Sequence, residues 1–284
     1  MECSEINNNI KDNLKDGDFL SIELSPSLNQ HLDFYLKNNF FIKILSFISN
    51  IIVTDSPLGK YTHNPILTAS YIQSQTNIQV ISTFAMRDKN TPYSLSEIRT
   101  AEELNLCSYM FVTGDKTKDG KNVYEKSSTS FLKDVCIQKK THHLNTLMFS
   151  TCSNVLTSNV KKRIRQKILN GADVIVSQPI TSINEAYELK KYIDYLNNNL
   201  NIDREIYLVI GVFPVISLKT AMFIKNNVPG ADVNDILIKL LKNDDLNGAF
   251  NFNKKIIDTL IQDNFNIHLM TSNNFELMYN LIKE

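Results

Sequence analysis

One helix followed by one strand decides the fold of this chain: "SNVKKRIRQKILNGADVIVSQP", residues 158–179. The first part has helix-forming residues at helical spacing, and it ends in Asn170-Gly171, a typical helix C-terminal signal. A continuously apolar, β-branched run of strand length follows at 173–178. A strand that is apolar on both faces is typical of a parallel sheet that helices cover on both sides.

The same kind of unit recurs along the chain. Helical stretches at 94–104, 158–171 and 182–200 alternate with apolar runs at a period of about 30 residues, the length of a strand-helix-strand unit. Eight such runs predict an α/β fold, a closed (β/α)8 TIM barrel. An open doubly wound sheet is the alternative, but the chain has neither a G-x-G-x-x-G nor a G-x-x-x-x-G-K-[ST] turn. The apolar runs are 19–24, 51–54, 78–83, 107–113, 145–151, 173–178, 206–213 and 266–271.

Smaller signals refine this prediction. Ser94 and Glu97 have the spacing of a capping box at the start of a helix. Residues 230–264 form a helical stretch before the last strand that is longer than one barrel helix, and residues 1–17 are a polar extension or helix. Since no linker rich in Pro, Gly or Ser interrupts the chain, we expect residues 1–284 to form a single domain.

Composition narrows the class of protein. The 284 residues are 43% hydrophobic and carry 30 basic and 30 acidic side chains, so no global field favours nucleic acid as the main partner. The N-terminus lacks the apolar core of a secretory signal, and the apolar runs are too short or too interrupted to span a membrane. We therefore expect a soluble, cytoplasmic protein.

The cysteines and histidines do not form a recognisable metal or redox motif. The four cysteines lie far apart without paired spacing, which predicts reduced structural thiols instead of a zinc site or a disulfide framework. His142 and His143 are adjacent in an expected loop, so solvated side chains are expected there and no metal ligands. The cysteines are Cys3, Cys107, Cys136 and Cys152.

Polar residues follow the predicted strands, and in such a barrel the C-terminal strand ends meet at one mouth. Aspartates after strands often cap helices or form turns, so those at 55, 88 and 115 have a structural alternative. Glu23 suits neither role; burial would raise its pKa, as a general acid near neutral pH requires. Gln178 suits pairing with the edge of a heterocycle. The strand ends carry Glu23, Thr54-Asp55, Arg87-Asp88, Thr113-Gly114-Asp115, Gln178-Pro179 and Phe213-Pro214.

These strand ends make the chain resemble the methylenetetrahydrofolate reductase family over nearly its whole length. "SIELSP" is similar to the family's Phe-Glu-Phe-x-Pro, "MRDKN" to Cys-Arg-Asp-Arg-Asn, and "VTGD" to Thr-Gly-Asp. "NGADVIVSQP" is similar to Ala-Gly-Ala-x-x-x-x-Thr-Gln, and "IGVFPVISLKTAMFIKNNVPGADV" to the family's Pro-Gly-Ile-x-Pro segment and its continuation. "TDSPLG" and "SQPI" look most like the branch that is fused to a homocysteine methyltransferase domain.

The resemblance implies a role for several positions. Glu23 would be the general acid that helps to open the methylene bridge to an iminium before hydride attack. Asp115 would act beside the pterin and the flavin, and Gln178 would hydrogen-bond the pterin. Other positions match the family's flavin contacts, at Thr54, Thr83 and Lys167, and a substrate-stacking aromatic residue, here Leu218.

The resulting hypothesis is an oxidoreductase that reduces 5,10-methylenetetrahydrofolate, or a related methylene-tetrahydropterin, to the 5-methyl form in one-carbon and methionine metabolism. The resemblance implies FAD, with NAD(P)H or another reductant as electron donor, and a homo-oligomer that has an electron-donor or methyltransferase protein as a possible partner. Thr83, Met86 and Leu218 depart from the family pattern, where it has histidine, cysteine and an aromatic residue. They motivate the alternatives, which are a pterin-binding partner or divergent paralogue without flavin chemistry, or a pterin-linked methyltransferase.

Overall fold

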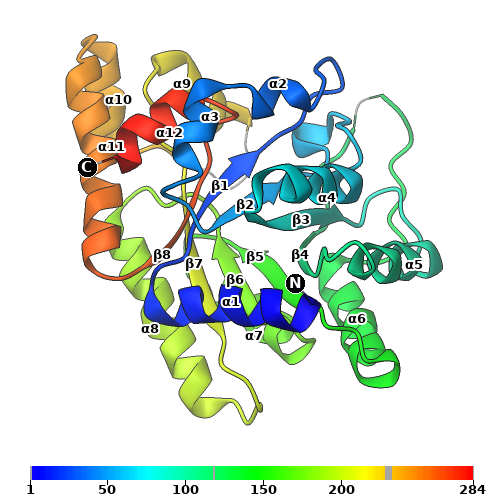
Figure 1. The fold of residues 1–284 in the computed structure, drawn as a ribbon. Helices are drawn as coiled ribbons and strands as arrows, with labels where there is room; N and C mark the ends of the chain where they lie inside the picture. The colour runs from blue at the N-terminus through cyan, green and yellow to red at the C-terminus, as the bar shows by residue number, and fades with distance from the viewer. Residues whose placement is uncertain (1, 118, 228–231, 284) are drawn as a thin grey trace.

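The chain forms a closed barrel of eight parallel strands in sequence order, surrounded by helices, in a computed structural model that describes residues 2–117, 119–227 and 232–283 (Figure 1). The barrel closes where β1 pairs with β8 in parallel, with Leu20 opposite Ile267. The predicted (β/α)8 TIM barrel is therefore confirmed. Its strands are β1 (Leu20–Leu24), β2 (Asn50–Val53), β3 (Gln79–Ala85), β4 (Ser108–Val112), β5 (Leu147–Cys152), β6 (Val174–Ser177), β7 (Tyr207–Val212) and β8 (Asn266–Leu269).

Helices cover the outside of the barrel, and the extra stretch before the last strand is also helical. That stretch folds as α10 and α11, while residues 230 and 231 at its start lie outside the described residues. Among the described residues, no helix is long and apolar enough to cross a bilayer. The helices are α1 (Cys3–Asp16), α2 (Asp33–Leu36), α3 (Asn39–Ile44), α4 (Pro65–Thr76), α5 (Thr91–Glu102), α6 (Ser128–His142), α7 (Ser158–Leu169), α8 (Ile183–Asn199), α9 (Leu218–Asn227), α10 (Asp235–Lys242), α11 (Leu246–Gln262) and α12 (Phe275–Ile282), with a short 3-10 turn at Pro57–Gly59.

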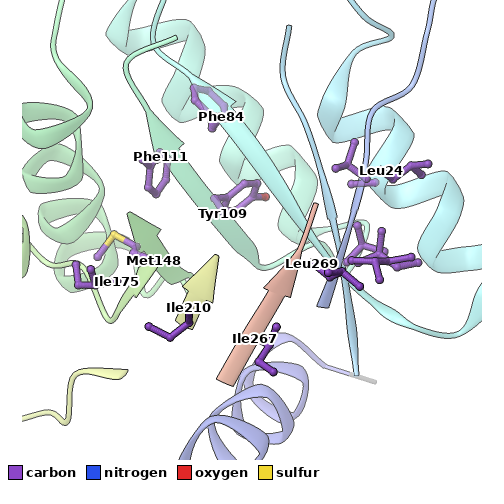
Figure 2. Packing of buried hydrophobic residues seen from close by; sticks show 14 of the residues in the cluster. Leu24, Phe84, Tyr109, Phe111, Met148, Ile175, Ile210, Ile267 and Leu269 are labelled. Atoms are coloured by element: carbon purple, nitrogen blue, oxygen red, sulfur yellow. The ribbon is translucent and has the colours of Figure 1, made fainter. Parts of the chain in front are cut away.

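The core has two layers because successive side chains of a strand point to opposite faces. One layer joins the outer face of the strands to the helices, and Figure 2 shows part of it, including Phe84, Phe111 and Ile210. The other layer fills the barrel interior, with Ile52 and Phe149 among its members. Both faces of each strand are thus buried, as the continuously apolar runs predict.

Helix α1 lies across the N-terminal end of the barrel (Figure 1). Its apolar stripe, Ile6, Ile10 and Leu14, is buried in the same cluster as the barrel interior. Cys3 of this helix forms a disulfide with Cys107, with the two Cα atoms 5.6 Å apart. The expectation of reduced thiols is wrong for this pair, because a sequence separation of 104 residues hides a proximity that only the closed barrel creates.

Two local predictions at helix ends have different outcomes. Helix α7 ends at Asn170-Gly171 as predicted, where Gly171 has φ +114° and an added Cβ would lie 2.7 Å from Met148 Cε. The capping box at Ser94 is wrong: α5 begins at Thr91, and the Asn90 side chain accepts a hydrogen bond from the Tyr93 N–H at 2.9 Å. Asparagine is as good a cap as serine, and Pro92, the second residue of the helix, is compatible with the first turn.

The region around the adjacent histidines also differs from its prediction. His142 is the last residue of α6, not part of a loop, and His143 is the left-handed residue that ends that helix. Both side chains are exposed. The part of the chain that the structure describes contains no group of three or more His, Cys, Asp or Glu side chains able to hold a metal ion.

Candidate active site

A cavity of about 1180 Å³ lies at the C-terminal ends of β1, β6, β7 and β8. Glu23, Gln178, Phe213 and Met270 line it from the strand ends. Its other walls come from the loops after β1 and β2 and from α9, α10 and α11, which together lengthen the barrel mouth outward. Apolar side chains contribute the larger part of the lining surface, and many polar and charged residues line the cavity as well, among them Lys60, Asp119 and Lys219. Such a lining suits a small organic ligand that also carries polar groups.

Glu23 is the acidic group at the strand-end side of this cavity. It occupies the fourth position of β1, and burial raises the pKa of its carboxyl group to about 7. The Ser25 hydroxyl, which donates to Glu23 Oε1 at 3.4 Å, lowers that pKa in part. A carboxyl group with this pKa is partly protonated at neutral pH and is suited to proton donation.

A second hydroxyl continues the hydrogen-bond chain behind Glu23. Thr54 Oγ1 donates to Ser25 Oγ at 3.0 Å, and Thr54 is only 7% exposed. Thr54 is not among the described residues that line the cavity. The position that the resemblance assigns to the flavin thus faces the hydrogen-bond partner of the acid.

Gln178 lies on the same cavity as Glu23. It follows β6 directly, and its backbone N–H donates to the Cys152 carbonyl at 2.7 Å, which holds this residue against the end of β5. Its side chain is exposed toward the cavity that it lines. The amide offers both a donor and an acceptor to a ligand, and the structure therefore brings Glu23 and Gln178 together.

Asp115 and Leu218 lie elsewhere. The Asp115 carboxylate accepts the Leu58 N–H at 2.8 Å, and its carbonyl accepts a hydrogen bond from Arg87. Leu218 begins α9 and packs in the small cluster of Val215 and Leu237. Neither residue is among the described residues that line the cavity.

Two further aspartates have structural partners. Asp55 accepts the Ala85 N–H at 3.0 Å and pairs with Lys89 at 3.1 Å. Asp88 has φ 63°, and its carboxylate pairs with Arg87 at 2.9 Å. Both residues thus serve the loops at the strand ends, as the structural alternative for aspartates predicts.

The other two positions assigned to the flavin are also outside the lining. Thr83, on β3, is 5% exposed, and its hydroxyl has no hydrogen-bond partner in the described part of the chain. Lys167, on α7, donates to the Thr151 carbonyl, and burial lowers its pKa. The positions that the resemblance offers for FAD therefore do not form a cradle that this structure opens to a ligand.

Sequence patterns did not indicate the aromatic and amide groups that the helices contribute. Phe223 from α9 and Phe252 from α11 line the cavity together with Tyr61 from the loop after β2. Asn253, buried in α11, holds the loop after β7 by accepting the Val215 N–H at 3.2 Å and donating to the Val215 carbonyl at 3.0 Å. Helical spacing alone does not separate a core residue from a cavity residue, so no local signal could have found them.

A closed parallel barrel with an acid and an amide at the C-terminal ends of its strands defines the class: a (β/α)8 barrel with its candidate site at the mouth. Within that class the chain belongs to the methylenetetrahydrofolate reductase family, whose model matches residues 17–284. A comparison with curated protein sequences finds no match. The family membership confirms the resemblance that the strand ends carry.

Solved structures share the fold. An uncharacterised protein from Clostridium thermocellum that binds two copies of 5-methyl-5,6,7,8-tetrahydrofolic acid is 18% identical, with a TM-score of 0.70 over 96% of this chain and 97% of that one. Oxaloacetate acetylhydrolase is 10% identical, with a TM-score of 0.54 over 98% of this chain and 84% of that one. A 2,3-dimethylmalate lyase is 9% identical, with a TM-score of 0.53 over 93% and 80%.

Proposed function

We propose that this chain reduces a 5,10-methylene-tetrahydropterin, with 5,10-methylenetetrahydrofolate as the first candidate, to the 5-methyl form. The observation that carries the proposal is Glu23: its pKa of about 7 suits a general acid, and it lies on the same cavity as Gln178 in a chain of the reductase family. A cytoplasmic setting in one-carbon metabolism and a homo-oligomeric state belong to the same proposal.

The chemistry needs one proton and one hydride. Protonated Glu23 gives its proton to N10 of the methylene bridge, the bond between N10 and the methylene carbon breaks, and that carbon becomes the electrophilic end of an iminium on N5. A hydride from a reduced donor then adds to the carbon, the donor is oxidised, and the Glu23 carboxylate regains a proton from water. Gln178 supplies a paired donor and acceptor that orient the pterin ring.

Two further observations support a folate in this cavity. The Clostridium thermocellum protein, which shares the fold, binds 5-methyl-5,6,7,8-tetrahydrofolic acid. The aromatic side chains of Phe213, Phe223 and Phe252 line the cavity and suit the flat rings of such a ligand.

Glu23→Gln tests the proposal, since the amide keeps the shape of the side chain and cannot donate the acid's proton. We expect the Kd for 5-methyltetrahydrofolate to stay close to that of the wild type and kcat to fall by about 100-fold to 10,000-fold, the range for loss of a general acid. Isothermal titration and a steady-state reduction assay measure the two quantities. Glu188→Gln, on the exposed face of α8, is the matched control. Unchanged turnover in Glu23→Gln would sink the proposal.

A second candidate is a pterin-binding protein without reductase activity. It is favoured by the burial or internal hydrogen bonds of Thr54, Thr83 and Lys167, the positions that the resemblance assigns to the flavin. Tight binding of 5-methyltetrahydrofolate, together with no reduction of the methylene form by flavin or nicotinamide donors, would select this candidate over the reductase.

A further inference from the structure

The loop after β2 folds into a compact segment, residues 56–62, which we call the mouth segment. It contains the 3-10 turn Pro57–Gly59, and both Ser56 and Leu58 have left-handed backbone conformations, with φ of 51° and 56°. The Thr62 hydroxyl accepts the Ser56 N–H at 3.2 Å, so the two ends of the segment are tied together. Its conformation is therefore specified by its own hydrogen bonds.

The mouth segment is fastened to the loops after β3 and β4. The Leu58 N–H donates to the Asp115 carboxylate at 2.8 Å, and the Tyr61 ring lies 5.3 Å from the Arg87 guanidinium carbon. Gly59 approaches the chain after β4 so closely that an added Cβ would lie 2.1 Å from the Lys116 carbonyl oxygen. The segment thus covers the strand ends of β3 and β4.

The charged groups beside the mouth segment form ion pairs and hydrogen bonds with their neighbours. Arg87 is 5% exposed and bonds to both the Asp88 carboxylate and the Asp115 carbonyl. Lys89 pairs with Asp55 and lies 3.7 Å from the centre of the Phe84 ring. These charged groups are therefore directed to each other and to backbone. Lys60 of the mouth segment and Asp119 of the loop after β4 line the cavity instead.

The consequence for a cofactor is geometric. Pro57, Leu58 and Tyr61 of the mouth segment form a wall of the cavity, which extends from Glu23 toward β6, β7 and α9 to α11. Thr54 and Thr83, on the neighbouring strands β2 and β3, lie outside that lining. Both threonines are buried, so a flavin in this cavity would not reach them without a change in the structure.

The cavity itself has room for more than one flat ligand. Its volume of about 1180 Å³ exceeds the range of roughly 300–1000 Å³ that is usual for one drug-sized ligand. Glu23 lines it from β1, and Phe223 and Phe252 line it from α9 and α11, so a ring placed against the acid would not fill it.

We propose that this chain works without a flavin: the mouth segment closes the β2–β4 side of the barrel, and a reduced nicotinamide binds beside the pterin in the cavity and gives its hydride directly. This inference rests on the proposed reductase function. The hydride leaves C4 of the dihydronicotinamide ring, which becomes the oxidised nicotinamide. The methylene carbon accepts it while the N10 bond is broken and Glu23 supplies the proton.

Flavin binding and isotope transfer test the proposal on the full chain. We expect the purified protein to be colourless and to retain no FAD or FMN after incubation and desalting. Reduction of methylenetetrahydrofolate by NADH or NADPH should proceed in flavin-free buffer at a rate that added FAD leaves unchanged. With donor that carries deuterium on the transferred C4 position, the new methyl group should keep the whole label, because direct transfer never passes through an exchangeable N–H.

Each contrary result overturns a defined part. A retained flavin, a rate that depends on added FAD, or loss of the label to solvent would overturn flavin-free transfer. The proposed function would still stand in that case, provided that the wild type reduces the substrate and Glu23→Gln does not. A colourless protein that binds 5-methyltetrahydrofolate but reduces the methylene form with no donor would overturn both proposals.

Discussion

Among single residues, Glu23 and its neighbours determine what the cavity can do. The Ser25 hydroxyl is the hydrogen-bond partner that opposes the effect of burial on the Glu23 pKa, and Thr54 donates in turn to Ser25. The Ser25 hydroxyl therefore affects the pKa of Glu23 directly, and the Thr54 hydroxyl acts on it through Ser25. In this arrangement Thr54 bonds to the hydrogen-bond partner of the acid, which differs from the flavin contact implied by the resemblance.

Substitutions of the two hydroxyls should shift the pH dependence of turnover. In the proposed mechanism the active form carries protonated Glu23, so we expect kcat to fall above a pH of about 7, approaching tenfold per pH unit. Ser25→Ala removes a bond that favours the carboxylate and should move this fall to higher pH; Thr54→Val should act in the same direction to a smaller extent. Thr54→Ser, which keeps the donor, is the control. A pH profile of kcat that is identical in Ser25→Ala and wild type would contradict this assignment.

Among the elements, the mouth segment covers the β2–β4 side of the C-terminal mouth, and α1 closes the N-terminal end of the barrel. The mouth segment is tied to Asp115 and Arg87, while α1 buries Ile6, Ile10 and Leu14 against the barrel interior. Both closures join parts of the chain that lie far apart in the sequence. Their roles follow from tertiary contacts. The resemblance therefore places Asp115 beside the ligand, whereas in the structure its carboxylate accepts the Leu58 N–H of the mouth segment.

Asp115→Ala separates these two roles. If the carboxylate fastens the mouth segment, its loss frees the Leu58 N–H, and trypsin should cleave after the exposed Lys60 faster than in the wild type. Mass spectrometry of a timed digest identifies the cut, and Glu188→Ala is the matched control. A fall in kcat of about 100-fold or more with unchanged cleavage after Lys60 would instead indicate a direct role in the reaction.

In the molecule as a whole, two buried titratable groups in the barrel give the free energy of unfolding opposite dependences on pH. Burial raises the pKa of Glu23 to about 7, and burial lowers the pKa of His268, on β8 with its ring nitrogen 3.0 Å from Ser21 Oγ, to about 3. Between pH 4.5 and 7 the native state binds the Glu23 proton more tightly than the unfolded chain, so that contribution to stability is lost as pH rises. Between pH 6.5 and 3 the unfolded chain takes up the His268 proton more readily, so stability is lost as pH falls.

His268→Asn should reveal the second effect. We expect its free energy of unfolding to fall less than that of the wild type between pH 7.5 and pH 4.5, by roughly 3 kcal/mol, because about two pKa units of the histidine's penalty lie in that window. Urea denaturation gives the free energy of unfolding at the two pH values. Comparing the change in that free energy between the two pH values removes any constant cost of the substitution. The exposed His143→Asn is the control. Equal pH dependence in His268→Asn and wild type would show that His268 does not limit stability in acid.

The sequence by itself determined the barrel, the order of its strands, and the presence of an acid near the end of β1 and an amide after β6. These features follow from local patterns: runs that are apolar on both faces and the residues that end them. Only the tertiary structure decided that Cys3 meets Cys107, that Thr54 faces Ser25, and that Asp115 fastens the mouth segment. Those outcomes depend on side-chain direction and on loops that meet across the closed barrel, and neither is encoded in the spacing of nearby residues.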